Sequence, residues 1–124
     1  MDKFPRYVAL TVGVGFVGFG LWAFVSPRSF YDTAATFGEY HEHFIHDLGA
    51  FQIAVGAMLF LAATMRDALY AALAGATIGH GVHIASHLLD ADQGRNQEAT
   101  IPFLLVIGGF LLAATILRSR QIRG

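Results

Sequence analysis

Four long apolar segments, separated by short polar ones, constrain the fold of this chain more than any other feature. They cover about residues 7–25, 44–65, 68–89 and 101–117. A helix of about 20 apolar residues is long enough to cross the hydrocarbon core of a bilayer. Because these segments use up most of a 124-residue chain, we expect a single all-α domain: an integral membrane four-helix antiparallel bundle.

Composition narrows the range of functions. Only 14% of the residues are charged and 55% are hydrophobic, whereas soluble domains carry roughly 25% charged residues. The formal net charge of -1 provides no basic surface for nucleic acid, and the absence of cysteine excludes disulfides and thiolate ligands. We therefore expect contact with a lipid bilayer and no nucleic-acid partner, with a homo-oligomer or a larger membrane complex left open.

Basic residues are divided unevenly between the two sides of the predicted bundle. Arg28 and Arg95 lie on one side. Six basic residues lie on the other side: Lys3, Arg6, Arg66, Arg118, Arg120 and Arg123. Because basic loops stay in the cytoplasm, this asymmetry predicts a multi-pass protein of the bacterial plasma (inner) membrane with both termini cytoplasmic.

The histidines fall into two groups, one before the second apolar segment and one at the end of the third. The first group is His41, His43 and His46, followed by Asp47. The second group is His80, His83 and His87, followed by Asp90. Ionisable side chains at membrane depth are costly and are functional-site candidates by default.

Helix geometry brings the two groups to one depth. The short Arg66-Asp67 turn predicts an antiparallel hairpin, in which residues whose numbers sum to about 133 lie level. His46 then lies level with His87, in the outer half of the membrane. At about 100° per residue, the second group and Asp90 share one helix face. A matching face on the second segment carries His43, His46 and Asp47, provided that its helix begins at His43.

This clustering predicts a His/Asp metal site between the second and third segments, near the extracytoplasmic face. Imidazole suits Zn, Fe and Cu, so we expect one of these transition metals. His83 and His87 have the i, i+4 spacing of helix-borne zinc ligands, and a carboxylate could bind the ion or orient an imidazole. The candidate ligands are His46, His83, His87, His80, Asp47, His43 and Asp90.

Several alternatives stay open at this point. A haem b could be held by two axial imidazoles, with Arg28 or Arg95 meeting its propionates. The chain could instead be an accessory subunit of a larger membrane complex, such as a respiratory one, or the histidines could relay protons. If a bound metal were catalytic, it would activate water or dioxygen, as in a membrane oxidoreductase or hydrolase. No residue pattern names a catalytic residue or a substrate.

Glycines are predicted to mark helix contacts. The G-x-G-x-x-G of residues 13–18 lacks the strand–turn–helix context of a dinucleotide site, so we interpret it as packing. The G-x-x-x-G of residues 75–79 predicts a second packing face. Gly49 and Gly56 would let another helix approach the second segment closely.

The layout resembles the DoxX-like small four-helix membrane proteins of bacteria. The resembling residues are Phe24-Val25-Ser26-Pro27 closing the first segment, Phe37-Gly38 ending the loop, and Asp47-Leu48-Gly49-Ala50-Phe51 opening the second segment. The resemblance covers most of the chain in layout and implies the fold and the membrane location. It carries over no catalytic residue, and the histidine-rich segments lie outside the resembling pattern.

Overall fold

The computed structural model describes residues 3–65 and 67–124. Within these residues all the regular secondary structure is helical, and the connecting loops carry one isolated β-bridge between Phe37 and Gly94. The helices are α1 (Phe4–Val25), α2 (Pro27–Thr33), α3 (Glu42–Thr64), α4 (Leu69–Leu89) and α5 (Gln97–Arg123). The all-α prediction is confirmed, and Arg66 of the predicted turn lies outside the described residues.

Among the described residues, three helices are long and apolar enough to cross a membrane: α1, α3 and α5. The chain is therefore best regarded as a small membrane protein, and the four predicted spans are supported for three segments. Helix α4 has a similar length, 21 residues, but it carries three imidazoles and a serine. These side chains lower its mean hydropathy below that of its neighbours.

Helix ends follow local chemistry. Pro5 and Pro27 lie in the first turns of α1 and α2, where a missing backbone N–H costs nothing. Helix α5 begins at Gln97, earlier than the apolar run predicts, so Pro102 lies inside the helix rather than in its first turn. The early start brings a polar residue, Gln97, into the helix packing.

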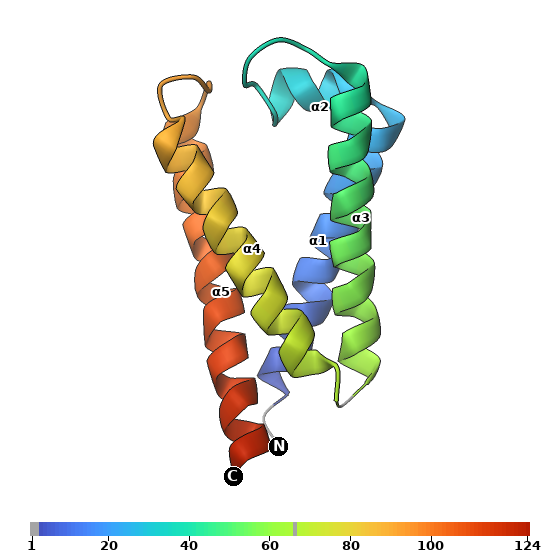
Figure 1. Ribbon diagram of the computed structural model, residues 1–124, viewed down its shortest axis with the longest axis vertical. Helices are drawn as coiled ribbons and strands as arrows, with labels where there is room; N and C mark the ends of the chain where they lie inside the picture. Colours follow the sequence, from blue (N-terminus) through green and yellow to red (C-terminus); the bar gives the residue numbers. More distant parts are fainter. Residues whose placement is uncertain (1–2, 66) are drawn as a thin grey trace.

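The long helices form two pairs rather than a closed four-helix bundle. Helix α1 packs on α3, and α4 packs on α5 (Figure 1). The pairs approach each other near the α3–α4 connection, and α3 and α4 diverge toward their other ends (Figure 1). The start of α1 and the end of α5 lie at one end of the molecule, and the start of α3 and the end of α4 lie at the other (Figure 1).

Glycines make the α1–α3 contact a backbone-to-backbone one. A Cβ built on Gly20 would lie 2.7 Å from the carbonyl oxygen of Gly49, and one on Gly56 would lie 2.6 Å from that of Gly13. The prediction that Gly49 and Gly56 admit a close helix is thus confirmed, and the helix is α1. Small residues allow such approach where side chains would hold helices apart.

Other predicted glycine contacts are not formed among the described residues. A Cβ built on Gly75 or Gly79 would meet no heavy atom within 4 Å, and the same holds for Gly15 and Gly18. The prediction of a G-x-x-x-G packing face on α4 is therefore wrong. Helix α4 instead contacts α5 through the face that carries its histidines.

Two buried histidines of α4 are bonded to α5. His80 bonds to the Leu104 carbonyl and His87 to the Gln97 side chain, and Leu73 and Leu111 belong to one buried core cluster. All six residues are buried. Because the seven-residue step from His80 to His87 is matched by the seven-residue step back from Leu104 to Gln97, these two polar contacts share one antiparallel register.

Candidate functional site

Three imidazoles on α4 form a row along the face toward α5. The ring centroids of His80 and His83 lie 6.0 Å apart, and those of His83 and His87 lie 4.8 Å apart. Their spacings of three and four residues place them on one helix face. The sequence prediction that these three share a face is confirmed.

His80 is the deepest of the three and is only 5% exposed. Its Nε2 lies 2.9 Å from the carbonyl oxygen of Leu104, which can only accept, so Nε2 carries the proton. Its Nδ1 is then a lone pair that is buried without a hydrogen-bond partner among the described residues. The hydrogen bond from His80 to Leu104 therefore links α4 to α5.

His83 and His87 point their Nε2 atoms at each other across 3.0 Å. His87 is buried, 8% exposed, whereas His83 is exposed. A pair of neutral imidazoles at this distance shares one proton, because one nitrogen must donate and the other must accept. His87 is therefore the buried member of the pair, and His83 is the exposed member.

Gln97 holds His87, the buried member of the pair, in place. Its Oε1 lies 2.7 Å from His87 Nδ1, and its Nε2 donates to the carbonyl oxygen of Arg95 at 3.1 Å. Because that carbonyl accepts only, the amide must present its oxygen to His87. Nδ1 of His87 then carries the proton, and its Nε2 is left as a lone pair facing His83.

Gln97 was not among the predicted site residues. It looked like part of a polar loop, because the apolar run begins only at Ile101. A signal was present: Gln97 precedes the buried Leu104 and Leu111 by steps of seven residues, which places it on the same helix face. A seven-residue register continued back into the polar segment would have found it.

The loop between α2 and α3 covers the His87 end of this row. The Phe37 ring lies edge-on to His87, with centroids 5.1 Å apart and planes at 83°. Phe37 also forms the β-bridge with Gly94, and the Thr36 hydroxyl oxygen accepts the backbone N–H of Arg95 at 3.2 Å. The imidazole pair is thus bounded by α4, by α5 and by the loop between α2 and α3.

The predicted ligands on α3 lie elsewhere. The His46 ring packs against Phe24 of α1, with centroids 5.1 Å apart. His43 Nε2 lies 3.6 Å from an Asp47 carboxylate oxygen, and both side chains are exposed. The reason is the glycine contact at Gly49, one turn further along α3, which brings α1 rather than α4 onto this face.

Asp90 is likewise separate from the imidazole pair. It is the C-cap residue of α4, and its carboxylate accepts a hydrogen bond from Gln93 Nε2 at 3.3 Å. Among residues 3–65 and 67–124, no group of three or more His, Asp or Glu side chains is placed to hold a metal ion. The seven predicted ligands are therefore not assembled into one site between α3 and α4.

Aromatic residues surround α2 at the same end of the molecule. The Arg28 guanidinium bonds to Asp32 at 3.0 Å and lies 4.9 Å from the centre of the Tyr40 ring. Trp22 donates from Nε1 to the Ser29 hydroxyl at 3.2 Å. This arrangement fits the headgroup zone, where amphipathic rings are favoured, and it engages Arg28, one of the two arginines considered for a haem propionate.

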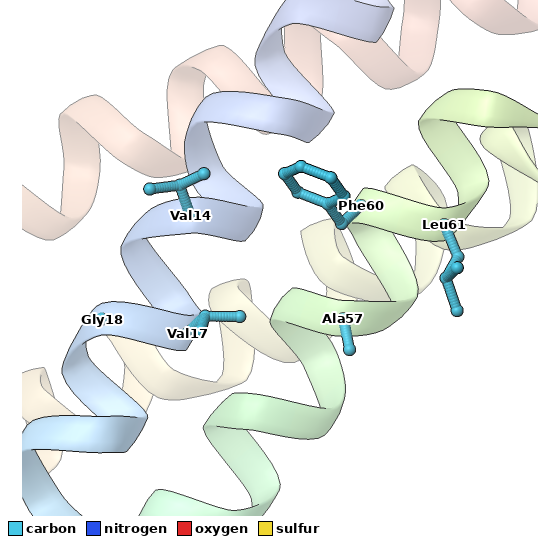
Figure 2. A pocket seen from close by; sticks show the side chains of 6 residues that line it. All are labelled: Val14, Val17, Gly18, Ala57, Phe60 and Leu61. Carbon is cyan, nitrogen blue, oxygen red and sulfur yellow. The ribbon is translucent and has the colours of Figure 1, made fainter.

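A shallow groove on the outer surface of α1 and α3 is apolar throughout. Figure 2 shows the side chains that line it: Val14, Val17, Gly18, Ala57, Phe60 and Leu61. Large apolar side chains elsewhere are also strongly exposed, among them Phe51 (74%) and Leu89 (82%). Such surfaces indicate contact with lipid rather than with water, and the groove holds no group that could do chemistry.

Comparison with known protein families, curated proteins and solved structures finds no match for this chain. The resemblance to DoxX-like proteins therefore stays a prediction from layout.

Proposed function

We propose that this small membrane protein binds a transition-metal ion through His83 and His87, within the α4–α5 pair. The proposal keeps two of the ligands predicted from sequence and moves the site from the α3–α4 interface to α4–α5. The observation that carries it is the facing pair of Nε2 atoms, with His87 oriented from behind by Gln97.

The orientation of His87 is the one that a metal ligand needs. Imidazoles that bind metals usually donate their other ring N–H to a carbonyl or carboxylate, which fixes the ring and raises its basicity. Gln97 Oε1 supplies this acceptor at 2.7 Å. The lone pair on His87 Nε2 is therefore aimed outward before any ion arrives.

The spacing also suits one ion. Zn–N bonds of about 2.0–2.1 Å at a tetrahedral angle hold two nitrogens about 3.3 Å apart. The observed separation is 3.0 Å, so small rotations of the two rings would let both nitrogens reach a single ion. His83 would carry its proton on Nδ1 instead of Nε2 when an ion binds, so that both Nε2 atoms present lone pairs. Metal binding would weaken as the pH falls, because protons compete with the ion for the two imidazoles.

The same spacing favours an ion over haem. Two axial imidazoles lie on opposite faces of a haem iron, so their nitrogens are about 4 Å apart with the porphyrin between them. His83 and His87 extend from one face of one helix, which leaves no room for a ring between them. The other coordination positions of an ion would face the exposed side of His83 and be open to water or to an external ligand.

Cobalt(II) is a suitable probe, because its absorption spectrum reports the number and kind of ligands. We expect the purified protein to bind about one Co²⁺, and the His83→Ala/His87→Ala variant to bind none. His43→Ala is the matched control, since His43 is also paired at i, i+4 but lies exposed on α3. Gln97→Leu should bind Co²⁺ about 10–100-fold more weakly. Equal binding by the double variant and the unchanged protein would overturn the proposal.

A further inference from the structure

Residues 36–38, here called the strap, connect the α1–α3 pair to the end of the α4–α5 pair that carries His87 and Gln97. The strap contacts residues 94–97 through the Phe37–Gly94 bridge and the Thr36 hydroxyl on the Arg95 N–H. Its Phe37 ring lies edge-on to the buried His87. The strap therefore covers the sheltered imidazole from the side that the helices leave open.

We propose that the strap is a lid, and that His87 becomes accessible only when the strap leaves residues 94–97. The contacts that hold the strap against residues 94–97 and His87 are local ones: a ring contact, a single β-bridge and the hydrogen bonds between the Thr36 hydroxyl and the Arg95 backbone. The Tyr31 hydroxyl of α2 also donates to the Gly38 carbonyl, which links the strap to α2 and not to residues 94–97. The strap lies between the end of α2 at Thr33 and the start of α3 at Glu42. It can lift without unwinding any helix.

Two loop residues allow the closed position. Gly38 has a φ of 61°, which a glycine adopts without steric cost. Gly94 lies directly beneath the Phe37 ring, and a Cβ built there would lie 2.5 Å from that ring and 2.5 Å from Gln97 Nε2. The closed lid therefore requires a residue without a side chain at position 94.

The lid also touches the residue that orients His87. The Arg95 carbonyl that accepts from Gln97 Nε2 also accepts a long hydrogen bond from the Thr36 hydroxyl, at 3.5 Å. Lifting the strap would remove Thr36 and Phe37 together, so it would free both His87 and the peptide that holds Gln97. The lid thus links exposure of the imidazole to loosening of its orienting amide.

Access to His87 can be tested without any metal. The chain has no cysteine, so Thr36→Cys/Arg95→Cys creates a single disulfide across the lid. The Thr36 Oγ1 to Arg95 N distance of 3.2 Å is compatible with the Cα separation of about 4.4–6.8 Å that a disulfide needs. Diethylpyrocarbonate modifies accessible imidazoles, and fragment mass spectrometry reports His87 separately from His83.

We expect oxidation of this variant to slow His87 modification at least tenfold, and a reductant to restore it. His43, which is exposed on α3, provides the internal reference and should not change. Phe37→Ala, which removes the covering ring without a disulfide, should speed His87 modification several-fold. Equal His87 rates in the oxidised and reduced forms, or no effect of Phe37→Ala, would overturn the lid.

The expectation that the lid controls metal exchange rests on the proposed function, but the lid and the metal site can be refuted separately. With the disulfide closed, release of bound Co²⁺ to a chelator should slow by the same factor as His87 modification. Protection of His87 in a protein that binds no Co²⁺ would overturn the metal site alone. Co²⁺ binding with unprotected His87 would overturn the lid alone.

Discussion

Replacing Gly49 with alanine should destabilise the protein, because this residue lies where α1 and α3 touch backbone to backbone. The added Cβ would lie 2.7 Å from the carbonyl oxygen of Gly20 and 3.1 Å from the backbone nitrogen of Phe24. Ordinary van der Waals contact begins near 3.5 Å, and both partners are backbone atoms that cannot rotate away. The two helices must therefore separate by several tenths of an ångström.

The size of the effect follows from two opposing contributions. Overpacking a close contact costs about 1–3 kcal/mol. Alanine in place of glycine within a helix returns about 0.5–1 kcal/mol, so the net loss in unfolding free energy should be about 1–2 kcal/mol for Gly49→Ala. Gly79→Ala is the matched control, because its Cβ meets nothing within 4 Å and only the favourable contribution applies.

Unfolding in mixed micelles with increasing sodium dodecyl sulfate, followed by the fluorescence of the single tryptophan, Trp22, measures both free energies. Trp22 lies on α1 within one turn of Gly20, so it reports on this contact. The two variants should differ by about 2 kcal/mol with opposite signs. If Gly49→Ala proved as stable as Gly79→Ala, a close α1–α3 contact would be refuted.

Three other predictions follow from the same contacts. Glu39→Cys should react with a membrane-impermeant maleimide on intact cells, and Ser119→Cys should react only after permeabilisation, because the two positions lie at opposite ends of the molecule. The reverse result would invert the predicted orientation. Thr77→Val removes the 2.8 Å hydroxyl–hydroxyl bond to α5 and should cost about 0.6 kcal/mol, measured in the same micelles. Gly94→Ala would push against the Phe37 ring, and hydrogen exchange of the strap amides should quicken several-fold; unchanged exchange would show that the strap tolerates a side chain there.

Much of the helical layout could be predicted from apolar runs alone. The extents of α1, α3 and α4 follow the predicted segments closely, because a run of apolar residues bounded by Pro27 or by a charged turn can only be helix in lipid. The pairing of helices could not be predicted. Gly13, Gly15 and Gly18 on α1 and Gly75 and Gly79 on α4 were all predicted to pack. Of these five only Gly13 lies against a neighbouring helix, since helix azimuth is set by the partner surfaces.

In the site, too, the features that depend on one helix could be predicted from the sequence, whereas the contacts between two helices could not. The shared face of His80, His83 and His87 depends only on α-helical geometry, so it was predicted correctly. The partner of His87 was not, because Gln97 belongs to the next helix and its role depends on the α4–α5 register. His46 and His87 were predicted to lie level, but equal depth does not bring two side chains together when α1 packs on the face of α3 that carries His46.

The polar contacts between α4 and α5 have a consequence for how the protein is made. Helix α4 alone would offer lipid a row of imidazoles, and each polar group without a partner is costly in hydrocarbon. Against α5, His80 bonds to Leu104 and His87 to Gln97, so the most polar part of α4 is satisfied by the segment synthesised immediately after it. We therefore expect α4 to wait at the translocation channel until α5 has emerged, and the two to enter the bilayer together as a preformed helical hairpin.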